Sequence, residues 1–274
     1  MKRTPTDEEI SEILKKLKKK KACLEGDLPG WIMKEGGEDM VERCHEAIKM
    51  AWVKPQSIPK EWSRTQIRLI PKSGRDTSKI DGWRPIAVGT NMNKIMMMIW
   101  SSRLEEMAIK KHWIHRRQFG FVKGKTMKGA ADLASAIIDR TKNVQVMQWD
   151  IERAFPSISS KEVSIMLSNL GAPLEFTQIL DKFYEEAPVS AVVGGKPGGE
   201  FQQCTWTQKW GLKQGCPASP LLMNLWTQPI VDRMGQETEF IQYADDMWAI
   251  CKEERKEDIR KLLSEMLECA GLVV

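Results

Sequence analysis

Two adjacent aspartates, Asp245 and Asp246, interrupt an otherwise apolar stretch and are the residues best suited to chemistry. They lie in the middle of the segment FIQYADDMWAIC, residues 240–251. Strand-forming residues precede them and a second apolar run follows, so the segment predicts a β-hairpin with both carboxylates at its turn. Neighbouring carboxylates repel each other unless a cation binds there, and their hard oxygen ligands suit Mg²⁺. The simpler interpretation is a polar turn, since Asp is a favoured turn residue.

A third aspartate, Asp150, is placed in the same way far upstream. It ends the short apolar strand expected over residues 144–149, much as Asp245 lies at a strand end. Strand-end carboxylates on neighbouring antiparallel strands can converge on one point. Two-metal phosphoryl transfer needs such a set, in which one cation activates an attacking hydroxyl and the other holds the triphosphate and leaving group. Strand-end aspartates are also common caps, so spacing alone leaves both interpretations open.

Two further segments carry residues suited to ligand contact. Phe155 follows Asp150 closely, on an expected turn where its ring would be half exposed. The segment GLKQGCPASP, residues 211–220, combines two glycines with Gln214 and a proline directly before an expected helix. Glycine lets the backbone approach a ligand closely, and a helix N-terminus favours an anion.

The surrounding pattern predicts elements that can hold these residues. Apolar periodicity predicts helices over residues 38–53, 91–107, 127–140, 174–186, 219–234 and 254–269, with others capped by Thr6 and Ser159. Strands are expected over residues 66–70, 85–88, 144–149, 189–193 and 201–207, besides the acidic hairpin. The first two form a hairpin with a long basic loop. Antiparallel strands with helices gathered on one face make an α+β arrangement.

The bulk composition is typical of a globular protein, and its mild positive charge is compatible with a polyanionic partner. The chain has 274 residues, 42% of them apolar and 29% charged, with a net charge of +5. The basic run at residues 14–21 predicts either a solvated helix face or a contact with RNA backbone. Six scattered cysteines without a C-x-x-C pair argue against a zinc module and fit a reducing compartment. We expect an intracellular protein, because no secretory signal or membrane-length apolar run is present.

Five sequence blocks occur in the order found in reverse transcriptases. They are IPK…GWRPIAV, QFGFVKGKT, MQWDIERAFPSIS, GLKQGCPASPLLMNLW and IQYADDMWAI. They most resemble the blocks of LINE-type, non-LTR retrotransposon enzymes, in which Cys216 also has a usual counterpart. The resemblance runs from about Lys15 to Val274. It implies an RNA-directed DNA polymerase with the palm and fingers of a right-hand polymerase, which acts on an RNA template, a DNA primer and dNTPs.

The resemblance also implies a role for each acidic residue. Asp150 and Asp245 match the metal-binding aspartates of the palm, and Asp246 supports them. The backbone carbonyl of Ile151 is an expected further ligand. The ions would be two Mg²⁺, with Mn²⁺ as an alternative.

Other residues match positions that contact the nucleotide or the nucleic acid. Phe155 matches the steric gate, whose ring takes the space of a ribose 2′-hydroxyl. Gln214 and Gly215 match the contacts to the incoming nucleotide and the templating pair. Four basic residues are assigned to phosphates, namely Lys72 and Arg84 to the triphosphate and Lys123 and Lys125 to nucleic acid.

A Walker A loop is excluded at residues 120–126, because the two glycines of this segment are too close together.

The resemblance predicts three consecutive segments. Residues 1–60 would be a helical extension, residues 61–143 the fingers, and residues 144–274 the palm, with the thumb absent. In the family, an Asn, a Lys, a primer grip and the thumb follow this point, so we expect a fragment of a longer protein. A eukaryotic element would place it in nucleus and cytoplasm as a ribonucleoprotein. The element, its host, any attached endonuclease and its template stay open.

Two other functions compete with DNA synthesis. One is a non-catalytic nucleic-acid-binding remnant of the same fold. Such remnants usually lose one of the metal-binding aspartates, whereas all three are present here. The other is an RNA-directed RNA polymerase, which shares the palm but is disfavoured by Phe155 and by the YADD segment.

Overall fold

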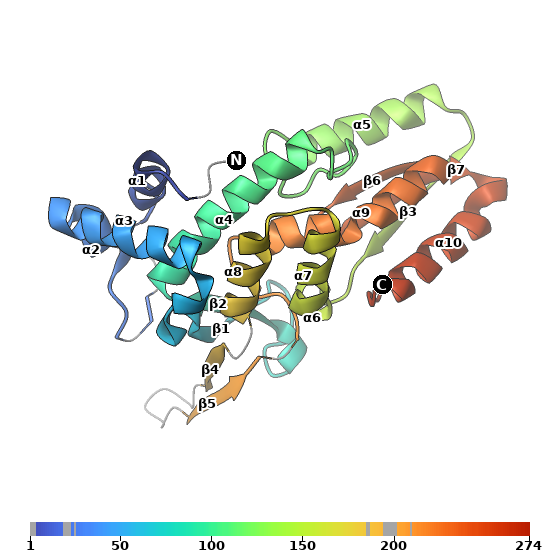
Figure 1. Cartoon of the computed structure of the whole chain (residues 1–274). Coiled ribbons are helices and arrows are strands. Elements are labelled where there is room, and N and C mark those ends of the chain that lie inside the picture. Colours follow the sequence, from blue (N-terminus) through green and yellow to red (C-terminus); the bar gives the residue numbers. More distant parts are fainter. Residues whose placement is uncertain (1–3, 19–22, 25, 185–186, 194–201, 209) are drawn as a thin grey trace. The chain divides into compact units, whose positions relative to one another are not determined.

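The chain folds into two compact units, each built from two separate stretches of sequence. Unit 1 combines Met1–Ser102 with Ser160–Ala218, and unit 2 combines Arg103–Ser159 with Ser219–Val274. The computed structural model describes residues 4–18, 23–24, 26–184, 187–193, 202–208 and 210–274 (Figure 1).

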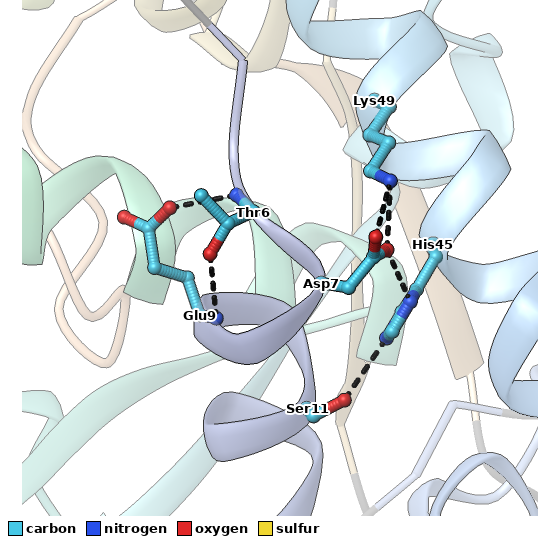
Figure 2. Close-up of polar contacts among 6 residues, drawn as sticks. All are labelled: Thr6, Asp7, Glu9, Ser11, His45 and Lys49. Carbon is cyan, nitrogen blue, oxygen red and sulfur yellow. Dashed lines mark hydrogen bonds and ion pairs between the residues drawn. The ribbon is translucent and has the colours of Figure 1, made fainter. Parts of the chain in front are cut away.

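Three helices begin unit 1: α1 (Asp7–Lys15), α2 (Gly30–Glu35) and α3 (Glu38–Val53). The capping box expected at Thr6 is confirmed (Figure 2). The Thr6 hydroxyl accepts a hydrogen bond from the backbone N–H of Glu9 at 3.3 Å, and the Glu9 carboxylate accepts one from the Thr6 N–H at 2.7 Å. Two otherwise unpaired backbone donors are thereby satisfied at the start of the helix.

Asp7 joins α1 to α3 (Figure 2). Its carboxylate lies 2.7 Å from Lys49 Nζ and 2.6 Å from His45 Nδ1, and His45 Nε2 lies 3.2 Å from Ser11 Oγ. The hydrogen bond from Lys49 is the main reason that the pKa of Asp7 is lowered. The order of Ser11, His45 and Asp7 is that of a hydrolase triad. Ser11, however, lies inside α1, where its own N–H bonds a helix carbonyl, so its backbone cannot donate to an oxyanion.

Unit 1 contains a four-stranded sheet in the order β2-β1-β4-β5. Strands β1 and β2 are antiparallel, as expected, and so are β4 and β5. Strand β4 pairs parallel to β1, so the second hairpin adds to the sheet of the first, which differs from the purely antiparallel expectation. The strands are β1 (Thr65–Pro71), β2 (Trp83–Gly89), β4 (Pro188–Val193) and β5 (Gln202–Thr207).

Aromatic residues form the core among the helices of unit 1. Trp52 meets Phe176 edge-on, with ring centroids 5.6 Å apart, and the Trp100 indole N–H donates to the Phe176 carbonyl at 3.0 Å.

Helix α4 (Asn91–Lys110) contributes residues to both units. The remaining elements of unit 1 are η1 (Pro55–Ser57), η2 (Lys60–Ser63), η3 (Ile80–Gly82), α7 (Ser160–Asn169) and α8 (Leu174–Tyr184).

Unit 2 is built on a three-stranded antiparallel sheet in the order β3-β7-β6. Ile137 of α5 packs with Ile241 and Ile250 on one face of this sheet. Phe240 and Met247 lie on the other face, fully buried, and α9 and α10 contact β6 and β7. The elements are α5 (Met127–Arg140), β3 (Val144–Asp150), α6 (Ala154–Ser157), α9 (Ser219–Glu237), β6 (Glu239–Tyr243), β7 (Asp246–Lys252), η4 (Glu253–Arg255) and α10 (Lys256–Cys269).

The α+β class is confirmed, while the placement of helices needs one correction. They were expected on one face of the palm sheet, but α5 covers the face that carries Ile241 and Ile250. Both faces need cover, because strand residues alternate between them and both sets are apolar. The two units do not follow the segments 1–60, 61–143 and 144–274, so that division stays a prediction.

Two further observations concern the environment of the chain. Within the described ranges, no helix combines the length and the apolar character that crossing a membrane requires. All six cysteines are free.

Candidate active site

The predicted acidic hairpin is present, but its turn is Ala244 and Asp245, so only one of the two carboxylates expected at the turn lies there. Strand β6 ends at Tyr243 and β7 begins at Asp246, and these two residues pair across the hairpin. Ala244 has a φ of 56°, in the left-handed region. Two-residue hairpin turns that match the strand twist need a positive φ at their first central residue. The turn leaves Asp245 exposed and Asp246 half-buried.

Strand β3 brings Asp150 to the same end of the sheet. Asp150 pairs with Asp246 across β3 and β7, and the Ile151 N–H donates to the Asp245 carbonyl at 3.1 Å. The Asp150 side chain is exposed overall, and the partial loss of its hydration is the largest cause that raises its pKa, followed by the charges of Asp245, Asp246 and Glu152. The three predicted aspartates are therefore neighbours, and the charges of Asp245 and Asp246 act on Asp150.

Their chemistry fits a hard divalent cation, since the side chains offer only oxygen donors. Across the residues that the structure describes, no three His, Cys, Asp or Glu side chains are gathered into a metal-holding group. The aspartates thus share a location and a donor type without already forming a ligand set. The roles assigned to Asp150, Ile151, Asp245 and Asp246 stay predictions.

Two neighbours of the aspartates were not singled out from the sequence. Gln148 Nε2 donates to Asp246 Oδ1 at 3.3 Å. The Glu152 N–H donates to the Val273 carbonyl at 2.7 Å, and the two residues form an antiparallel bridge. Gln148 lies two positions before Asp150 on the same strand, and side chains at that spacing point to one face. Strand alternation was the signal that could have found it.

Phe155 lies in the short helix α6, close in sequence to the aspartates. Arg153 before this helix has a φ of 48°, which turns the chain sharply away from β3. The Phe155 ring is half-buried, in agreement with the exposure expected from the sequence. Its role as a steric gate stays a prediction.

In unit 1, the loop that carries Gln214 and Gly215 is fixed on two sides. The Ala87 N–H of β2 donates to the Gln214 carbonyl at 2.6 Å. Gly215 has a φ of 114°, and a Cβ there would come within 2.5 Å of the Ala87 carbonyl oxygen, so only glycine fits. On the other side, Lys213 Nζ donates to the Phe183 carbonyl at 2.8 Å. Burial lowers the pKa of Lys213 to about 8.

Lys72 and Arg84 lie at the loop end of the β1–β2 hairpin, also in unit 1. The Lys72 N–H donates to the Gly82 carbonyl at 2.7 Å, and Arg84 stands opposite Ile70. Arg84 is exposed and Lys72 half-buried. Neither side chain has a hydrogen bond or ion pair with a residue in the described part of the chain. Both cations are therefore available to a ligand.

The two lysines expected to contact nucleic acid differ sharply in their surroundings. Lys123 is exposed, whereas burial lowers the pKa of Lys125. The Lys125 ammonium is engaged by its own loop, whereas the Lys123 side chain has no hydrogen bond to a described residue, and the contacts of both with nucleic acid stay predictions. Lys125 Nζ donates to three carbonyl oxygens, at 3.3 Å to His115, 2.6 Å to Arg116 and 2.9 Å to Gln118.

The structure thus gathers the predicted residues into separate sets. Asp150, Asp245 and Asp246 come together in unit 2. In unit 1, Gln214 and Gly215 lie against β2, the strand that carries Arg84.

Comparison with known proteins gives a match over most of the chain. A family described as "Reverse transcriptase (RNA-dependent DNA polymerase)" matches residues 70–272. The range includes every predicted site residue.

Curated relatives come from insect retrotransposons. The Pol polyprotein of the type-1 retrotransposable element R2 from Popillia japonica is 27% identical over 171 residues, which cover 61% of this chain and 23% of that protein. The polyprotein of element R2DM from Drosophila melanogaster is 26% identical over 208 residues, covering 70% of this chain and 18% of that protein. The chain therefore spans about a fifth of the length of these relatives.

A solved structure shows the same fold at low identity. Apo telomerase from Candida tropicalis superposes with a TM-score of 0.56 at 14% identity, covering 79% of this chain and 44% of that chain. At this identity the similarity concerns the fold alone. It agrees with the expected palm and fingers.

Proposed function

The chain belongs to the reverse transcriptase (RNA-dependent DNA polymerase) family, and from this premise we propose that it extends a DNA primer along an RNA template. The resemblance inferred from the five sequence blocks is confirmed at the level of the family, and the relatives are retrotransposon proteins. Reverse transcriptases generally depend on divalent metal ions. The substrates, the ions and the residue roles given below are our proposal.

The observation that best supports this proposal is the pairing of Asp150 with Asp246 beside the turn residue Asp245. The mutual repulsion of these carboxylates contributes to the raised pKa of Asp150. A divalent cation removes this repulsion, so the site favours metal binding. Two Mg²⁺ ions, or Mn²⁺ in their place, would lower the pKa of the primer 3′-hydroxyl and stabilise the charge of the triphosphate.

The chain contributes position and charge at this site. Asp150 and Asp245 would hold the ions, with the Ile151 carbonyl as a further ligand. Asp246 supports them, and its hydrogen bond from Gln148 at 3.3 Å fixes one carboxylate oxygen. Oriented carboxylates stabilise the transition state without reorganising during the reaction.

The remaining residues would select and hold the nucleotide and the nucleic acid. The half-buried ring of Phe155 would exclude a ribose 2′-hydroxyl and so favour dNTPs. The side chains of Lys72 and Arg84 would bind the triphosphate, for which the planar fork of arginine is well suited. Gln214 and Gly215 would contact the nucleotide and the templating pair. Lys123 would meet a phosphate of the template or primer, and Lys125 would order the loop that carries it.

Primer extension on an RNA template tests the proposal directly. In a protein that carries this domain with the segments natural to it, Asp150→Asn should lower extension by about a thousandfold. This loss is expected because metal ions stabilise the transition state by several kcal/mol, and each 1.4 kcal/mol changes the rate by about tenfold. Asp139→Asn, at an exposed position of α5, is the matched control and should extend normally. Full extension by Asp150→Asn would overturn the proposal.

The alternative function, a non-catalytic nucleic-acid-binding remnant, predicts a different outcome in the same assay. Such a protein would bind the RNA–DNA duplex yet fail to extend it with Mg²⁺ or Mn²⁺. A comparison of binding with extension in the unsubstituted protein separates the two functions.

A further inference from the structure

A cluster of buried polar side chains lies directly behind the turn that carries Asp245. Polar groups cost free energy in a protein interior unless they are hydrogen-bonded, so a cluster of them at this place calls for a reason. None of its members has a role in the proposed reaction. All of them are 0% exposed, namely Gln118, Asn224, Thr227 and Gln242.

Hydrogen bonds link this cluster from helix α9 to the turn. Gln118 Nε2 donates to the Asn224 carbonyl at 2.9 Å and to Thr227 Oγ1 at 3.1 Å, both on α9. The same nitrogen lies 3.4 Å from Gln242 Oε1. Gln242 Nε2 in turn donates to the Ala244 carbonyl at 2.7 Å. A continuous path of side chains therefore ends on the peptide that precedes Asp245.

The backbone around Gln118 reinforces this path along the edge of β6. The Gln242 N–H donates to the Arg117 carbonyl at 3.0 Å, and the Phe119 N–H donates to the Gln242 carbonyl at 2.8 Å. Gly120 then abuts the turn, since a Cβ there would lie 2.1 Å from the Ala244 nitrogen. Asn224 Nδ2 donates to the Gly120 carbonyl at 2.7 Å and holds this glycine in place.

The turn that these contacts surround has an unfavourable backbone conformation. Ala244 has a φ of 56°, which a residue with a Cβ adopts only at a cost. Such a conformation persists when the surrounding structure fixes it, and it occurs preferentially at active sites. Here the Gln242 side chain holds the Ala244 carbonyl, while Gly120 packs against the Ala244 nitrogen.

We propose that Gln118 and Gln242 are positioning residues that hold Ala244 in its left-handed conformation and thereby aim Asp245 at the metal ions. This inference rests on the proposed function, because it assumes that Asp245 binds a metal. Neither glutamine touches substrate or metal itself, and both act through the peptide that precedes the ligand.

The composition of the cluster supports a positioning role over simple core filling. Gln118 Oε1 and Asn224 Oδ1 are buried without a donor among the residues that the structure describes. Apolar side chains of similar size would fill this space without that cost. What the amides provide, and apolar groups cannot, is a directed bond to the Ala244 carbonyl.

The test replaces Gln242 by methionine, which keeps the length of the side chain and removes its donor. In primer extension, Gln242→Met should raise the Mg²⁺ concentration for half-maximal rate by about tenfold and lower kcat, because a small displacement of a catalytic group costs up to about a hundredfold. The KM for dNTP should stay unchanged. Hydrogen–deuterium exchange of residues 243–247, measured without metal, should become faster. Thr227→Val removes one partner of Gln118 and should act in the same direction more weakly.

The matched control is Thr238→Val, at the opposite end of the same hairpin. It removes the hydrogen bond from Thr238 Oγ1 to the Ile250 carbonyl, 2.8 Å long. This variant should lose stability and leave both the Mg²⁺ requirement and the exchange of the turn unchanged. The positioning role is overturned if Gln242→Met matches this control in both measurements. If Gln242→Met does not fold, the same comparison is made with Thr227→Val and decides.

Asp245→Asn, assayed in parallel, separates this inference from the proposed function. Full extension by Asp245→Asn means that the proposed function itself is wrong. Loss of extension in Asp245→Asn, together with normal Mg²⁺ dependence in Gln242→Met, means that only the positioning role is wrong.

Discussion

The acidic hairpin β6–β7 and the hairpin β1–β2 are both antiparallel pairs that carry charged residues near their loops, but they hold these residues differently. Behind the turn of β6–β7, Gln242 and Gln118 are fully buried. Gln118 donates a hydrogen bond to Gln242, which donates one to the Ala244 carbonyl. On β1–β2, the side chains of Lys72 and Arg84 make no hydrogen bond or ion pair with a described residue. The backbone of Arg84 is held by the strand ladder, and that of Lys72 by its N–H bond to the Gly82 carbonyl.

The difference agrees with the tasks proposed for the two hairpins. A metal ligand must be in place before the reaction, because its benefit comes from not having to reorganise. A lysine or arginine that binds a triphosphate has a long side chain, so its charged group can move with the ligand. We therefore expect changes behind the turn of β6–β7 to alter metal dependence and kcat. Changes on β1–β2 should alter the affinity for nucleotide.

Among the changes that separate the two hairpins, the largest effect is expected from Gly120→Ala. The added Cβ would lie 2.1 Å from the Ala244 nitrogen, so the turn must shift. Extension should fall by about a hundredfold, as expected for a displaced catalytic group, and the melting temperature should drop. Gly129→Ala on α5 is the control, because its Cβ would meet nothing closer than 3.4 Å. If Gly120→Ala and Gly129→Ala have the same extension rate and melting temperature, the turn tolerates displacement and the prediction is wrong.

A smaller and different effect is expected from Arg84→Ala. Loss of a charge-assisted contact to phosphate should raise the KM for dNTP by about tenfold. The Mg²⁺ requirement should not change, in contrast to the variants behind the turn. Arg84→Lys should recover only part of the loss, since lysine lacks the planar fork. An unchanged KM in Arg84→Ala would remove the assigned role of this hairpin.

The smallest effect concerns the stability of the metal-free protein. Partial desolvation and three neighbouring carboxylates raise the pKa of Asp150, so the folded state binds this proton more tightly than the unfolded chain. The stability due to the protonated carboxyl is full below the ordinary value of 3.8 and is lost as the pH rises through the raised value. Asp150→Asn should therefore melt higher than the unsubstituted protein at neutral pH, and the difference should vanish in acid. Identical melting temperatures at neutral pH would contradict the assigned repulsion.

Local patterns predicted much of this structure. The helix over residues 38–53 and the helix over residues 127–140 have the bounds that the sequence indicated. The capping box at Thr6 and the acidic hairpin also follow from short-range signals, although the turn lies one residue earlier than expected, at Ala244 and Asp245. Periodicity and capping depend on neighbours along the chain, which is why they are visible without a structure.

The arrangements that were missed depend on residues far apart in sequence. Gln118 meets Gln242 across 124 positions, and no local pattern marks either glutamine as buried. The parallel pairing of β4 with β1 depends on which strand edges meet, and alternation within a strand is silent on that. The residue type of Lys125 suggests a phosphate contact. Its three hydrogen bonds to carbonyls depend on how the loop folds, so the sequence does not reveal them.

The central claim is that the aspartates at the end of the β3-β7-β6 sheet bind the metal ions of DNA synthesis. Electron paramagnetic resonance of Mn²⁺ tests it, with the protein bound to a chain-terminated primer, an RNA template and dNTP. The unsubstituted protein and Asp139→Asn should each bind two ions, as two-metal transfer requires. Asp245→Asn should bind fewer. If Asp245→Asn retains both ions at the same affinity, Asp245 is not a metal ligand and the account is wrong.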